Sequence, residues 1–276
     1  MSADFLKPCK ERVRTEILNV SYSCLFDLAI PWNTAELYEA ACKAGFDGVK
    51  GDVSPSADGK LIMCHDSFFN FDENGRVLYP GETGTTRKDI RDMTAAECTS
   101  FEYANESARK NLGYHARVAE LETLIKICKR YGKFPYITVR DREIDLCVHE
   151  VWRLLRQYDM TEHCIVNSFS PETLRAMRSL DENVCLSLVF GPHEALSAKQ
   201  IDVAASLGNC VVCVFETKEE QQTGALYAEA ADATRYAEER GVVLHYAHAH
   251  DTGSYRLGLS RGFRGFQCLR SDALCR

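Results

Sequence analysis

The apolar positions of the chain follow two alternating patterns from one end to the other. Short runs rich in β-branched and aromatic residues predict buried strands, at residues 17–23, 48–54, 61–66, 134–140, 164–169, 184–190, 210–215, 242–249 and 265–270. Between them, apolar residues recur every three or four positions, which predicts amphipathic helices at residues 33–45, 118–132, 143–158, 170–180, 197–208 and 227–241. Repeated strand–helix units indicate a parallel sheet, because the crossover between parallel neighbours requires a helix.

The number of strands and the length of the chain favour one closed barrel. Eight of the strands fit a barrel if 61–66 is an additional hairpin strand, and 276 residues is a typical length for this architecture. Neither GxGxxG nor GxxxxGK[ST] follows the first strand, which excludes the commonest nucleotide-binding open sheets. The sequence therefore predicts a single α/β domain over residues 1–276 with the TIM (β/α)8 barrel fold.

Residues 67–117 interrupt the strand–helix rhythm. They contain a polar loop rich in Gly, Asp and Thr, a short helical segment and a second polar stretch. Their apolar content predicts no core of their own, so they read as an insertion after the second barrel strand rather than as a separate domain. A long insertion at this end of a barrel is often a lid or a substrate-binding cap.

Composition and charge narrow the possible partners. The net charge of -7 and the pI near 5.7 argue against nucleic acid and anionic membrane surfaces. The start of the chain does not resemble a secretory signal, and no segment has the apolar length of a membrane span.

The 13 cysteines lie mostly in apolar segments, which predicts buried reduced thiols in a cytoplasmic protein. Cys210 and Cys213 lie in one strand, where their spacing points the side chains to opposite faces and argues against zinc or redox use.

Several segments resemble one known family. Residues 31–69 resemble the signature of the glycerophosphodiester phosphodiesterases, in which a P-E-N-T helix start precedes an E-x-D-V strand and an H-D pair. Further similar segments are 93–101, 119–132, 166–180 and 262–274. The resemblance implies a TIM barrel with its site at the C-terminal ends of the strands. It also implies a divalent metal held by carboxylates of E-x-D and E-x-K, with two histidines as acid and base.

The chain keeps part of that pattern. By the resemblance, His65 and Asp66 match the H-D pair and Asp52 matches the aspartate of E-x-D, whereas Lys50 stands in place of its glutamate. Further departures are Thr138 and Arg140 in place of E-x-K, Ser23 or a neighbour in place of the first histidine, and Trp32 in place of the P-E-N-T glutamate. One carboxylate beside an ammonium is a poor cage for a hard cation, so we expect no metal cofactor. The alternative is Mg²⁺ or Ca²⁺ held by other residues such as Asp66, His248 or His250.

The residues themselves predict an anion-binding site. Lys50 and Asp52 share one strand face, and Arg140 ends its own strand, so both cations and His65 are expected to converge on one pocket. We assign His65, Lys50 and Asp52 as catalytic and Arg140 as substrate-binding. The competing interpretations are a structural Lys50–Asp52 ion pair, a buried structural His65, and Arg140 paired with Asp141 or Glu143.

Three further residues are candidates for substrate binding. Alternation along strand 242–249 places His245 on one face and Tyr246, His248 and His250 on the other. His248 and His250 then line the mouth of the barrel, with His248 a possible acid or base, or they are polar mouth residues with no proton to transfer. Trp32 either stacks on a substrate or packs at the start of its helix.

These residues favour three functions. The first is metal-independent acid–base chemistry on a phosphodiester or another anionic small molecule, by attack of a neighbouring hydroxyl or by elimination or isomerisation with Lys50 as base. The second is a catalytically inactive pseudoenzyme that binds an anionic ligand or a protein partner through residues 67–117. The third is metal-dependent hydrolysis with recruited ligands.

Overall fold

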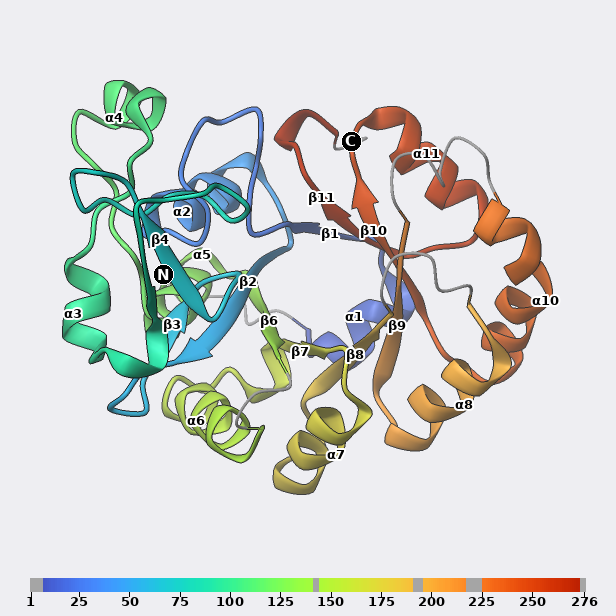
Figure 1. Cartoon of the computed structure of the whole chain (residues 1–276). Coiled ribbons are helices and arrows are strands. Elements are labelled where there is room, and N and C mark those ends of the chain that lie inside the picture. The colour runs from blue at the N-terminus through green and yellow to red at the C-terminus, as the bar shows by residue number, and fades with distance from the viewer. Residues whose placement is uncertain (1–6, 141–143, 191–195, 217–224, 274–276) are drawn as a thin grey trace.

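Eight parallel strands form a closed barrel in the computed structural model, which describes residues 7–140, 144–190, 196–216 and 225–273 (Figure 1). They pair in chain order, and the first strand pairs with both the second and the last, which closes the sheet. The strands are β1 (Leu18–Ser21), β2 (Gly48–Pro55), β6 (Phe134–Val139), β7 (Ile165–Ser168), β8 (Cys185–Val189), β9 (Cys210–Phe215), β10 (Leu244–Ala249) and β11 (Gly265–Cys268). The predicted TIM barrel is confirmed.

Helices surround the barrel and bury their apolar faces against it (Figure 1). All six predicted helices are present, as α2 (Ala35–Ala44), α5 (Leu121–Tyr131), α6 (Ile144–Gln157), α7 (Pro171–Leu180), α8 (Ala198–Leu207) and α10 (Ala225–Glu239). The sequence did not predict α1 (Cys9–Thr15), which is short, or α11 (Thr252–Ser260), whose glycines weaken its helical pattern. In α11, the Asp251 side chain caps the first turn by accepting a hydrogen bond from Ser254 N. Within the described part of the chain, no helix combines the length and apolarity that crossing a membrane requires.

Large apolar side chains fill the N-terminal half of the barrel. Phe134 and Tyr136 pack there with residues of five other elements, including Cys9 and Val13 of α1. Gly48 provides room for this packing, since a Cβ at that position would lie 2.2 Å from the Phe134 ring. The closed lower half leaves the C-terminal ends of the strands as the place for a site.

The cysteines lie as the strand pattern predicts. Cys210 packs in the core between the sheet and the helices, while Cys213 faces the barrel interior beside Val189 and Ala247. All twelve cysteines of the described residues are buried and free of disulfides.

The insertion has a small core, contrary to expectation. After β3 (Leu61–Met63), which pairs antiparallel with β2 as the predicted hairpin strand, the chain forms β4 (Phe68–Phe71), β5 (Thr86–Asp89), α3 (Ala95–Ser100) and α4 (Glu106–Leu112). Its few apolar residues are large enough to make a separate cluster, which contains Phe69, Phe71, Val77, Ile90, Met93, Ala95, Cys98 and Tyr103 and includes Ile62 and Cys64 of the hairpin. The insertion lies on one flank of the barrel, and α8 and α10 lie on the other (Figure 1).

His245 is a titratable group inside the barrel. Its side chain is buried, and neither ring nitrogen has a hydrogen-bond partner among the described residues. Burial lowers the pKa of His245 to about 4.

We expect His245 to make the fold sensitive to acid. A histidine in the unfolded chain has a pKa near 6.5, whereas the pKa of His245 in the folded protein is about 4. Protonation therefore favours the unfolded chain. The stability that the neutral His245 ring contributes is complete above pH 6.5 and is lost as the pH falls towards about 4. Between about pH 7 and about pH 4.5, His245→Phe should therefore lose about 2 kcal/mol less free energy of unfolding than the wild type. Urea unfolding at both pH values measures this, with the exposed His149→Phe as control; equal losses in all three proteins would contradict it.

Candidate active site

A cavity of about 190 Å³ opens where the barrel strands end. Every barrel strand, or the residue that follows it, contributes to its wall, and this is the end at which TIM-barrel active sites lie. The lining residues are Tyr22, Lys50, Asp52, His65, Thr138, Arg140, Asn167, Phe169, Val189, Phe215, Ala247, His248 and Gln267.

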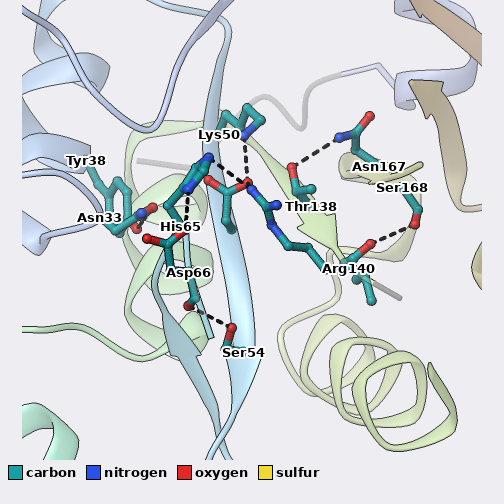
Figure 2. Close-up of polar contacts among 12 residues, drawn as sticks. Asn33, Tyr38, Lys50, Ser54, His65, Asp66, Thr138, Arg140, Asn167 and Ser168 are labelled. Carbon is teal, nitrogen blue, oxygen red and sulfur yellow. Dashed lines mark hydrogen bonds and ion pairs between the residues drawn. The ribbon is translucent and has the colours of Figure 1, made fainter. Parts of the chain in front are cut away.

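A buried ion pair forms the charged centre of the cavity. Lys50 Nζ donates a hydrogen bond of 2.9 Å to Asp52 Oδ1, and the two side chains are 5% and 2% exposed (Figure 2). Arg140 Nη2 lies 3.9 Å from the same carboxylate oxygen. The structure thus brings together the two cations and the aspartate, as the strand alternation predicted.

The surroundings keep both members of this pair charged. Burial alone would lower the pKa of Lys50, but the Asp52 carboxylate outweighs it, and the pKa of Lys50 is raised. Burial alone would likewise raise the pKa of Asp52, but Lys50, His65 and Arg140 hold it below its usual range. Lys50 is therefore a fixed ammonium, which makes it a poor general base.

His65 is oriented from both sides. Its Nδ1 lies 2.9 Å from Asp66 Oδ1, and its Nε2 lies 3.0 Å from Arg140 Nη2 (Figure 2). A guanidinium only donates hydrogen bonds, so this network assigns the lone pair to Nε2 and the proton to Nδ1, which donates to Asp66. His65 thus holds a basic nitrogen next to Arg140 at the cavity wall.

The two candidate histidines of β10 have different positions. The register with β11 shifts between Ala247 and Ala249, and this irregularity turns His248 into the cavity. The prediction that His248 shares a face with Tyr246 is wrong, because Tyr246 packs in the outer core. Burial, followed by the charge of Lys50, lowers the pKa of His248 to about 3, so its ring is neutral. His250 is not among the residues that line the cavity; its ring centroid lies 6.1 Å from that of His248.

Trp32 connects the rim of the site to the insertion. Its ring centroid lies 6.5 Å from that of His65 and 5.9 Å from that of Tyr79 in the insertion. Trp32 lines a small adjoining pocket with His65 and Asp66, not the central cavity. A larger pocket of about 420 Å³ borders His65 and Arg140 and is walled on one side by insertion residues Ser67, Phe68 and Arg91.

The sequence did not single out Tyr22, Asn167 or Gln267, which also line the cavity. Tyr22 directly follows β1, whereas its neighbour Ser23 is buried and is not part of the wall. Asn167 Nδ2 donates a 3.1 Å hydrogen bond to Thr138 Oγ1, and its Oδ1 has no partner among the described residues. Alternation along the first and fifth predicted strands is the signal that could have placed Tyr22 and Asn167 at the mouth.

The donor set at the cavity does not suit a divalent cation. No group of three or more His, Cys, Asp or Glu side chains in the described ranges is arranged to hold a metal. The buried Asp52 presents one oxygen to the Lys50 ammonium, and the other oxygen has no hydrogen-bond partner among the described residues. A hard cation needs several oxygen ligands, and here it would also face a fixed positive charge.

Comparison with known proteins gives one consistent family. The model of the "Glycerophosphoryl diester phosphodiesterase family" matches residues 28–246. The glycerophosphodiester phosphodiesterases of Caldanaerobacter subterraneus and Bacillus subtilis are 21% and 24% identical over 58% and 56% of this chain. These alignments span 62% and 53% of the two relatives, which is less than two thirds of their lengths.

Solved structures of the same kind share the fold. An Oleispira antarctica phosphodiesterase, solved with the product sn-glycerol-3-phosphate, is 13% identical with a TM-score of 0.73, over 94% of this chain and 95% of that one. A glycerophosphodiester phosphodiesterase from Agrobacterium tumefaciens is 16% identical with a TM-score of 0.65, over 93% and 97% of the two chains.

The burial of Asp52 gives a prediction about stability. Lys50→Met leaves the Asp52 carboxylate buried with Arg140 as its nearest remaining cation, so it should lower the free energy of unfolding by about 3 kcal/mol. Lys50→Met combined with Asp52→Asn removes the unpaired charge and should recover more than half of that loss. Urea unfolding of Lys50→Met, Asp52→Asn and the double variant measures this coupling. Strictly additive effects would show that the pair is not coupled.

Proposed function

Because the chain belongs to the glycerophosphoryl diester phosphodiesterase family, we propose that it cleaves phosphodiesters of the glycerophosphodiester class in the cavity at the mouth of its barrel. The observation that carries this proposal is the convergence of Lys50, Arg140 and His65 on one wall of that cavity. The product complex of the Oleispira phosphodiesterase supports a phosphate-bearing ligand for a barrel of this shape.

The charges in the cavity suit a phosphodiester monoanion. Lys50 and Arg140 contribute two positive charges and Asp52 one negative charge, so this group carries a net charge of about +1. The Arg140 guanidinium lines the cavity and has planar donors that suit phosphate oxygens. The 39% exposure of the Arg140 side chain shows that a ligand can reach it.

His65 supplies the general base. Once Arg140 turns to the phosphate, the lone pair on His65 Nε2 is released to take a proton from the attacking hydroxyl, which is a neighbouring hydroxyl of the substrate or a water. Asp66 at Nδ1 stabilises the imidazolium that results. The negative charge that builds on the phosphoryl oxygens faces Lys50 and Arg140. Elimination or isomerisation with Lys50 as base fits less well, since the pair with Asp52 keeps Lys50 protonated.

We further propose that this chemistry is independent of metal. Lys50 and Arg140 place fixed positive charge around the buried carboxylate, where a cation would otherwise be needed to offset the phosphate charge. The ion pair with Lys50 and the absence of a suitable donor cluster in the described residues support this reading.

The proposal predicts activity that resists chelation and depends on Arg140. Release of the alcohol from a glycerophosphodiester should be unchanged by EDTA, and Arg140→Ala should lower kcat/KM by roughly 100- to 1,000-fold. Arg235→Ala is the control, because Arg235 is exposed on α10, pairs with Asp232 and is not among the residues that line the cavity. Activity that EDTA abolishes and Mg²⁺ or Ca²⁺ restores would contradict metal independence.

The alternative function, a catalytically inactive barrel that binds an anionic ligand, can be tested separately. It is favoured by the lack of any histidine before residue 65, which leaves the cavity without the first histidine of the resembled pattern. A protein that turns over no diester, yet whose melting temperature rises with sn-glycerol-3-phosphate, would be a ligand-binding barrel and not an enzyme.

A further inference from the structure

The proposed reaction needs a second proton-transfer group besides His65. Cleavage of a P–O bond leaves an alkoxide, which has to be protonated as it departs, while His65 is occupied in taking the proton of the attacking hydroxyl. The cavity therefore requires a side chain that carries a transferable proton at neutral pH.

Besides His65 and Tyr22, the cavity has four titratable lining residues, and none of them meets this need. Asp52 is ionised and carries no proton, and Lys50 cannot release its proton without leaving the buried Asp52 carboxylate uncompensated. Arg140 keeps its proton under all ordinary conditions. His248 is a neutral imidazole at neutral pH, because burial and Lys50 disfavour its charged form. Among the lining residues of the described chain, the phenol of Tyr22 remains.

Tyr22 is placed and polarised for this purpose. It directly follows β1, and Lys50 Nζ lies 4.2 Å from the centroid of its ring. Its ring also meets that of His248 edge-on, with the centroids 4.3 Å apart. Tyr22 is partly buried and lines the cavity, so a ligand in the cavity can contact its side chain. Burial raises the pKa of the Tyr22 phenol and keeps it protonated until it is used.

We propose that Tyr22 is a catalytic residue, and that its phenol protonates the leaving oxygen of the diester. This inference rests on the proposed phosphodiesterase function. As the P–O bond breaks, its electron pair goes to the leaving oxygen, which takes the phenol proton and departs as an alcohol. The Lys50 ammonium, 4.2 Å from the centroid of the Tyr22 ring, stabilises the phenolate that remains. His65 holds the proton of the attacking hydroxyl and returns it through solvent to Tyr22, which restores both groups.

The dependence on the leaving group tests this role. Tyr22→Phe keeps the ring contacts with Lys50 and His248 and removes only the hydroxyl. The substrates are two esters of glycerol 3-phosphate, one with choline and one with 4-nitrophenol. Choline leaves as an alkoxide and needs a proton, whereas 4-nitrophenolate leaves without one. We expect Tyr22→Phe to lower kcat by roughly 100- to 1,000-fold for the choline ester and by less than about 5-fold for the 4-nitrophenyl ester.

Matched variants separate this role from others. His65→Asn should lower kcat for both esters, because both need the attacking hydroxyl to be deprotonated. Tyr236→Phe removes a phenol that binds Asp202 outside the barrel and should change neither rate. If the wild type is active and Tyr22→Phe slows both esters equally, or slows neither, the role of Tyr22 is overturned and the phosphodiesterase function stands. A wild type that cleaves neither ester overturns the proposed function, and the role of Tyr22 with it.

Discussion

The Lys50–Asp52 ion pair is the interaction on which the rest of the site depends. Two charges that are almost fully buried are stable there because each compensates the other. The pair fixes Asp52 as the anion that Arg140 approaches, and Arg140 in turn contacts His65. It also sets the character of the cavity, since a permanent ammonium now sits between Asp52 and the Tyr22 ring. One lysine thus determines the electrostatics of the barrel mouth.

The fold could be predicted almost entirely from local patterns. Strand and helix periodicity located every barrel strand and six helices, because each depends on which face of a segment is buried. The core of the insertion was missed, since a few aromatic residues such as Phe69 and Phe71 bury much area without raising the apolar fraction of a polar segment.

The site was predictable where it follows strand alternation and not where alternation fails. Lys50, Asp52 and Arg140 converge because they lie on regular strands. His248 was expected at the mouth on the strand face of Tyr246, but it lines the cavity through a shift in register that the alternation of residues does not indicate. The expectation of Ser23 or a neighbour did not single out Tyr22, because the end of a short strand is uncertain by one or two residues in the sequence. The contact between Trp32 and Tyr79 joins segments distant in sequence, so it needed the folded structure.

The charged and the apolar residues of the cavity lie on opposite walls, and this asymmetry concerns which ester bond of a diester is cleaved. The fixed cations project from β2 and β6, while the opposite wall of Val189 and Phe215, from β8 and β9, is apolar. A diester has two ester bonds of similar strength, and a symmetric pocket would not distinguish them. Under the proposed function, the carbon skeleton and the phosphate of a diester would have different preferred walls in this asymmetric cavity, and the orientation of the bound diester would decide which of its two ester bonds is cleaved.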